Sequence, residues 1–225
     1  MSPYKVRGSL FMFRKRLVAT VAAAPLLLLA GQALADTTIS DKRTAPVSTG
    51  TINSGAADNI IIVAAGSIKI PATGPTGPIV NVNTNNTLVN KGEISSQDVN
   101  GSVGVLVNGG VTTTITNQGQ ITINDSYDQN AAANDTDHDG NLDGAFATGT
   151  GRYGVRFTGP GTVTGSFLND TTGAITVEGN DSWGVSLESA LNGNFTNYGT
   201  INILGTNTYG IQTTGPITEI GRAHV

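Results

Sequence analysis

A nine-residue phrase recurs along the chain at intervals of about 26 residues, and this recurrence limits the fold more than any other feature. The phrase reads apolar, x, Asn, x, Gly, x, Ile, x, Val or Ile, and its copies begin at Leu88, Ile115, Phe167 (with two extra residues) and Phe195. A degenerate earlier copy spans 66–70. A unit of this length carries too few apolar residues to bury a core alone, so the copies must stack on one another.

A second phrase follows the first in most copies. It reads aromatic or Val, Gly, Val or Ile, x, apolar, and it begins at Val103, Tyr153, Trp183 and Tyr209. Both phrases have the period of two that is typical of strands, and Gly and Asn turns separate them. Stacking predicts two inward columns and one column at a turn: Ile94, Ile121, Ile175 and Ile201; Val105, Val155, Val185 and Ile211; and Asn90, Asn117, Asn169 and Asn197.

These patterns predict an all-β fold, a parallel β-helix (β-solenoid) of ~26-residue repeats after an N-terminal signal helix. We expect it to be right-handed, by analogy with known β-solenoids. The recurrent glycines suit corners, where a positive φ or a close backbone approach is needed. An antiparallel sandwich of Thr-rich strands is the alternative, but a sandwich does not require the same phrase to repeat in register.

Composition excludes several classes of protein. The chain has no Cys, so disulfide scaffolds and thiolate metal sites are ruled out. Five of the 12 basic residues precede the first apolar run, and all 16 acidic residues lie at or after Asp36. The chain after residue 35 therefore carries 7 − 16 = −9 charges, with no basic stripe, and we expect no nucleic-acid partner.

The N-terminus has the three parts of a secretory signal peptide. Arg14-Lys15-Arg16 precedes the apolar stretch 17–30, and Ala33-Leu34-Ala35 offers small residues before a cleavage point. We predict a signal peptide over 1–35 that engages the export machinery, with translation starting at Met1 or at Met12. A membrane anchor is the alternative.

The C-terminus departs from the repeat. Residues 219–225 end in Ile-Gly-Arg-Ala-His-Val, which a common sequencing adapter encodes. We predict that 219–225 are not native and that the repeat region spans 36–218; a natural tail is the alternative.

A signal peptide followed by Asn-x-Gly-x-Ile phrases, each answered by Tyr/Trp-Gly-Val, resembles the passenger region of bacterial autotransporters (type V secretion) over roughly 45–218. The resemblance implies a Gram-negative source, a β-helical passenger at the cell surface or outside the cell, and an outer-membrane barrel in a C-terminal part that this sequence lacks. The alternative is a secreted solenoid that a separate partner exports.

The sequence favours a structural or adhesive role over catalysis. His138 is the only histidine before the tail and no G-x-S-x-G turn is present, so a nucleophilic triad is not expected. A polysaccharide lyase or glycosidase is the alternative, and its candidate catalytic residues are Arg152, Arg156, Glu178, Asp181 and Glu188. Of these, only Glu178 holds the same position in the repeat as another carboxylate, that of Asp125. We otherwise expect these side chains to be solvated and outward. Presented loops would contact a host or matrix glycan or protein. Tyr153, Trp183 and Tyr209 would pack at a corner or, less favoured, stack on sugars.

An acidic insert interrupts the repeat at about 124–151, and it holds six Asp and no Lys or Arg. Within it, Asp135, Asp137, Asp139 and Asp143 have the spacing of the first nine positions of an EF-hand or dockerin calcium loop, with Gly140 at the sharp turn. Position twelve is Phe146 rather than Glu. The pattern predicts a weak calcium site with His138 toward solvent; a solvated acidic loop is the alternative.

Overall fold

A computed structural model describes residues 36–131 and 134–220, which lie in one compact unit. The predicted signal peptide (1–35) and most of the predicted non-native tail (219–225) lie outside the described residues. No helix in the described part of the chain is long and apolar enough to cross a membrane.

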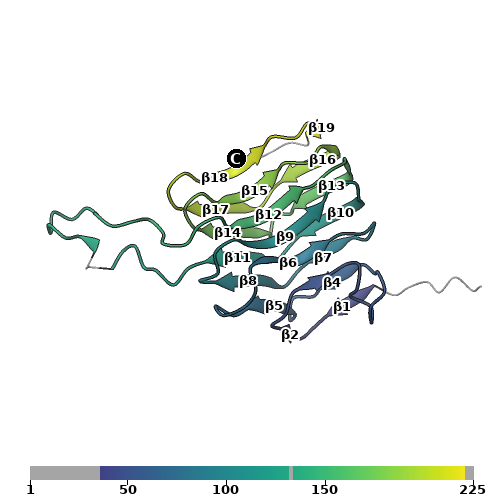
Figure 1. Cartoon of the computed structure of the whole chain (residues 1–225), viewed down its shortest axis with the longest axis horizontal. Coiled ribbons are helices and arrows are strands. Elements are labelled where there is room, and N and C mark those ends of the chain that lie inside the picture. Colours follow the sequence, from purple (N-terminus) through teal and green to yellow (C-terminus); the bar gives the residue numbers. More distant parts are fainter. Residues whose placement is uncertain (1–35, 132–133, 221–225) are drawn as a thin grey trace, which may run out of the picture. The chain divides into compact units, whose positions relative to one another are not determined.

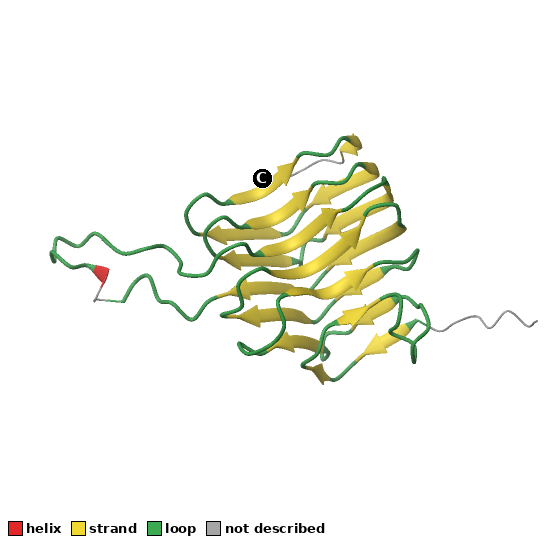
Figure 2. Ribbon diagram, viewed as in Figure 1, coloured by secondary structure: helices red, strands yellow, loops and turns green. Residues whose placement is uncertain are grey.

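The described residues form 19 strands in three parallel sheets, and each coil contributes one strand to each sheet (Figure 2). Sheet A contains β1 (Thr37–Ile39), β4 (Ile60–Ile62), β7 (Leu88–Asn90), β10 (Thr112–Asn117), β13 (Val163–Asn169), β16 (Leu191–Asn197) and β19 (Ile217–Ile220). Sheet B contains β2 (Lys42–Arg43), β5 (Ser67–Ile70), β8 (Glu93–Gln97), β11 (Gln120–Asn124), β14 (Ala174–Glu178) and β17 (Thr200–Leu204). Sheet C contains β3 (Val47–Ser48), β6 (Gly77–Val82), β9 (Ser102–Asn108), β12 (Tyr153–Thr158), β15 (Trp183–Leu187) and β18 (Tyr209–Thr213).

Each strand pairs with the strand three places later in the chain, as a solenoid of about seven turns requires (Figure 1). The prediction of an all-β parallel solenoid is confirmed, and the sandwich alternative is wrong because the strands within every sheet run parallel. The handedness stays a prediction.

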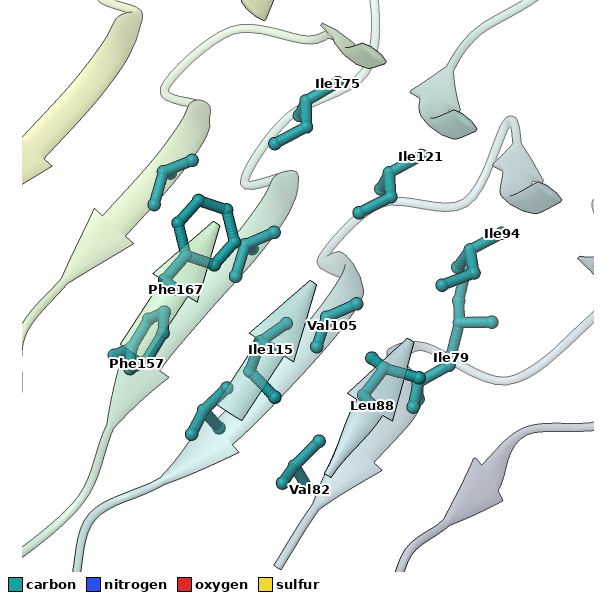
Figure 3. Close-up of a cluster of buried hydrophobic side chains, with 14 of the residues drawn as sticks. Ile79, Val82, Leu88, Ile94, Val105, Ile115, Ile121, Phe157, Phe167 and Ile175 are labelled. Carbon is teal, nitrogen blue, oxygen red and sulfur yellow. The ribbon is translucent and has the colours of Figure 1, made fainter. Parts of the chain in front are cut away.

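The interior consists of the predicted apolar columns. Ile121 pairs with Ile94 on one side and with Ile175 on the other, and all three are buried (Figure 3). Val105, Val155 and Val185 form the second column in the same way. The side chains of both columns become more exposed at the last described coil, where Ile201 is half-buried and Ile211 is 43% exposed.

The four predicted asparagines form a buried ladder at the turn between sheets A and B. Each side-chain amide donates to the Oδ1 of the next asparagine, and the three bonds are 2.8 Å long: Asn90 to Asn117, Asn117 to Asn169 and Asn169 to Asn197. The ladder satisfies amides that would otherwise be buried without partners.

The recurrent glycines of the first phrase allow the backbones of neighbouring coils to approach closely. A Cβ on Gly92 would lie 2.1 Å from the Gly66 carbonyl oxygen, and one on Gly119 would lie 2.2 Å from that of Gly92. None of these three glycines has a positive φ. The coils therefore meet backbone to backbone at this corner, and of the two reasons that the sequence offered for glycine, only close approach applies there.

Candidate functional site

The acidic insert leaves the solenoid at the corner between sheets B and C, after β11 and before β12 (Figure 1). The preceding and following coils cross this corner in short turns, 98–101 and 179–182. The insert instead runs from Asp125 to Arg152 and extends away from the stacked coils as the long teal loop in Figure 1. It is the largest departure from the repeat in the described residues.

A buried ion pair joins the two ends of the insert. Nη1 of Arg152 lies 3.2 Å from Oδ2 of Asp125, and the two residues are only 1% and 6% exposed. The same carboxylate oxygen accepts the backbone N–H groups of Thr148 (3.1 Å) and Gly149 (2.9 Å). We call this set of contacts the insert clamp.

Arg152 also ties the clamp to the neighbouring coils. Its Nε donates to the Val99 carbonyl (3.2 Å) and Nη1 donates to the Glu178 carbonyl. A Cβ on Gly149 would lie 2.2 Å from the Arg152 guanidinium carbon, so a larger residue at this position would displace the guanidinium from the clamp. The clamp thus fixes the base of the insert to the coils before and after it.

The clamp shifts the pKa of two carboxyl groups in opposite directions. Burial by itself raises the pKa of Asp125, but N–H donors from Gly149 and Thr148 and the charge of Arg152 bring it below its usual value. Burial and the negative charge of Asp125 raise the pKa of Glu178. Asp125 is therefore held as a charged structural anchor.

The expectation that Arg152 is solvated and outward is wrong. Arg152 immediately precedes the second phrase, a position that Ser102, Ser182 and Thr208 hold in the other coils. An arginine in a place otherwise given to small hydroxyl residues was the signal for a buried role. The long separation from Asp125, 27 residues, hid its partner.

At the distal part of the insert, three of the four predicted calcium ligands converge. Carboxylate oxygens of Asp135, Asp137 and Asp143 lie within 4.8 Å of one another. Asp139 is not in this group, and its Oδ1 accepts the Asn141 backbone N–H (2.7 Å). Hydrogen bonds from Thr136 lower the pKa of Asp143, so this carboxylate is charged at neutral pH.

Apolar side chains accompany these acidic residues. Phe146 is 55% exposed and Leu142 is 44% exposed, and His138 is also exposed in a left-handed conformation with φ of 62°. Both apolar side chains thus stand outside the core of the solenoid.

The remaining residues named as catalytic candidates lie in separate clusters. Arg156 and Glu188 form a bidentate pair on sheet C (2.8 and 3.0 Å), and Glu188 also accepts the Thr158 hydroxyl (2.7 Å). The Asp181 carboxylate accepts from Asn207 (2.6 Å) at the corner. The candidates Arg156, Glu188 and Asp181 are therefore not brought together with Arg152 and Glu178 in one cluster.

Three aromatic rings stack along the edge of sheet C. Tyr153 and Trp183 are 4.6 Å apart and nearly parallel, and Trp183 and Tyr209 are 6.4 Å apart. The guanidinium of Arg156 lies 4.4 Å from the centroid of the Tyr153 ring. Because the rings cover one another's faces, the ladder supports the packing role rather than stacking on sugars.

Comparison with known proteins gives one family. The model of the BigA third pectate lyase-like domain matches residues 35–221. No curated protein and no solved structure matches the chain.

Proposed function

Since the chain belongs to the family of the BigA third pectate lyase-like domain, we propose that it is an exported bacterial surface protein whose solenoid presents the acidic insert for binding. The solenoid supplies a stiff support and the insert supplies the contact. In this proposal the chain is an autotransporter passenger with a structural or adhesive role. Its targets would be glycans or proteins of a host or matrix.

One observation carries this proposal: the insert leaves the register of the coils undisturbed. Ile121, before the insert, pairs directly with Ile175, after it, and the Asn ladder passes from Asn117 to Asn169 without a break. An insertion that the fold does not need, and that a buried clamp nevertheless fixes in place, is best explained by a role in contact with other molecules.

Adhesion of bacteria that display the protein tests the proposal. The comparison variant replaces residues 128–145 by Gly-Ser-Gly-Ser, which shortens the insert and keeps the clamp. We expect displayed protein to bind host cells or matrix glycans and the shortened variant, at equal surface density, to lose this binding. Equal adhesion by both proteins would contradict the proposal.

A carbohydrate-active enzyme is the second candidate, and the raised pKa of Glu178 beside Asp125 and Arg152 favours it. A carboxyl near a second carboxylate and an arginine has the composition of a polysaccharide-cleaving site. Assays on polyuronides and neutral polysaccharides decide between the two. We expect no turnover; turnover that Glu178→Gln abolishes would establish the enzyme instead.

We also propose that the distal carboxylates bind calcium weakly. The convergence of Asp135, Asp137 and Asp143 supports this, because calcium prefers several oxygen ligands. The ion would neutralise like charges and order the loop.

A further inference from the structure

A hollow of about 500 Å³ lies on the outer face of sheet B, beside the turns that lead into its strands. Gly66, Gly92 and Gly119 end three of these turns, and because glycine has no side chain, the turns leave room above the backbone. Thr172 lines the hollow from the following coil, where the first phrase has two extra residues, and its hydroxyl donates to the Gln118 carbonyl (2.9 Å). We call this space the turn hollow; its volume is in the range of small-molecule sites.

A row of polar side chains runs across the turn hollow. Ser67, Glu93 and Gln120 are paired in register on β5, β8 and β11, so they stand on neighbouring strands about 4.8 Å apart (Figure 1). Ser67 is only 8% exposed, and its hydroxyl has no hydrogen-bond partner among the described residues. The exposed side-chain amide of Gln120 has none there either. Because buried polar groups are normally paired, the Ser67 hydroxyl indicates a place where a bound molecule supplies the partner.

The charges around the turn hollow cancel. Lys69 pairs with Glu93, and Asp170, whose carboxylate accepts the Gln118 side-chain amide (2.8 Å), offsets Lys91. The chain after residue 35 carries −9 charges, which disfavours the approach of anionic ligands. Amides and hydroxyls make up the rest of the polar lining, and together they both donate and accept hydrogen bonds. The matching ligand is uncharged and carries many hydroxyl groups.

A second hollow of about 340 Å³ adjoins the first, and Lys69 and Glu93 line both. This pair places an ammonium and a carboxylate side by side, so it can donate to one hydroxyl of a sugar and accept from the next. Pro71 and Ala72 also line the second hollow and offer apolar contact to the C–H groups of a sugar ring. The two hollows together therefore have room for more than one sugar unit.

We propose that the turn hollow and the adjoining hollow bind a neutral oligosaccharide. The row Ser67, Glu93 and Gln120 would hold successive hydroxyl groups of the sugar chain. The inference rests on the proposed function for the glycan target, and it adds a contact surface that is separate from the insert. Because the hollows are open to solvent, we expect weak binding that is measurable at millimolar sugar, with adhesion of whole cells still requiring the insert.

Saturation-transfer NMR is the test, with the protein and neutral tetrasaccharides of glucose, mannose, galactose or N-acetylglucosamine; tetragalacturonate is the charged comparison. We expect transfer to at least one neutral sugar and none to tetragalacturonate. Gln120→Leu, at an exposed site, should weaken this binding about tenfold, the loss expected for one hydrogen-bonding group. Thr176→Val is the matched control, because Thr176 stands on the next strand of sheet B and lines neither hollow. The shortened-insert variant should bind the sugar as the parent does.

Circular dichroism that matches the parent establishes that the variants are folded. Transfer to none of the neutral sugars overturns the inference, as does a preference for tetragalacturonate. Binding that Gln120→Leu leaves unchanged, or that the shortened insert abolishes, also overturns it, because the sugar would then lie elsewhere. The adhesion assay reports on the insert separately. Adhesion without sugar binding therefore removes only this inference, and sugar binding without adhesion removes only the proposed role of the insert.

Discussion

Gly154 and Gly210 hold the same position in two copies of the second phrase, but a following coil covers only Gly154. A Cβ on Gly154 would lie 2.4 Å from Cγ2 of Ile175 and 2.5 Å from the Gly184 carbonyl oxygen, whereas nothing lies within 4 Å of one on Gly210. We predict that Gly154→Ala lowers the free energy of unfolding by about 1–3 kcal/mol through overpacking. Gly210→Ala should be neutral or slightly stabilising. Urea denaturation measures both, and equal losses would contradict the assigned contacts.

Ser96 places a hydroxyl in an apolar column. It is 2% exposed between Ile70 and Ile123, and its Oγ has no hydrogen-bond partner. Ser96→Val should raise the free energy of unfolding by about 1 kcal/mol, because it removes an unsatisfied buried hydroxyl and adds apolar contacts. The control is Ser95→Val, where the hydroxyl points outward and donates to Glu93 (2.9 Å). Thermal denaturation that shows Ser96→Val to be destabilising would refute this reading of the column.

At the scale of elements, the insert clamp is the contact whose loss should be felt most. Arg152→Met leaves the Asp125 carboxylate buried without its cation, and we expect a cost of about 3–5 kcal/mol. Adding Asp125→Asn removes that charge and should recover part of the loss. Denaturation together with limited proteolysis of the insert measures the effect. If Arg152→Met had the same free energy of unfolding as the parent, the ion pair would contribute nothing to stability.

Calcium binding by the insert is a second prediction at this scale. We expect calorimetric titration to give a dissociation constant of about 10⁻⁴–10⁻³ M, as in weak extracellular calcium modules. Asp135→Asn/Asp137→Asn should abolish the heat of binding, since both carboxylates belong to the converging group. Asp128→Asn, outside that group, should not. Binding that is absent at millimolar calcium, or unaffected by the double variant, would leave a plain acidic loop.

The strands that the phrases form could be predicted because apolar and polar residues alternate within each phrase. Ile121 and Ile175 stack as expected, since a period of two fixes which side chains point inward. The clamp could not be predicted, because Asp125 and Arg152 occur once and only the three-dimensional path of the insert brings them together. The position of Asp139 outside the converging carboxylates could not be predicted either. Its carboxylate accepts a local hydrogen bond from Asn141, and the spacing of the ligands in the sequence gives no sign of this bond.

At the scale of the whole solenoid, placement of charge follows from stacking. Lys69 and Lys91 line the same surface hollow because coils of 26 or 27 residues bring them onto neighbouring turns. The sequence shows an acidic chain with few cations, and only the lateral order of the strands reveals that Lys42, Arg43 and Lys69 lie on neighbouring strands of sheet B. The same stacking isolates the insert, since the coils before and after it pair with each other directly, β11 with β14 in sheet B and β9 with β12 in sheet C.

Hydrogen exchange of the parent and the shortened-insert variant, followed by mass spectrometry, tests the central claim that a self-sufficient solenoid carries a separable insert. We predict slow exchange in β11, β12 and β14 of both proteins, because their amides lie in sheets between neighbouring strands, and fast exchange in residues 134–147 of the parent. Loss of protection in β11, β12 or β14 when the insert is shortened would contradict the claim, since the solenoid would then depend on the insert for its stability.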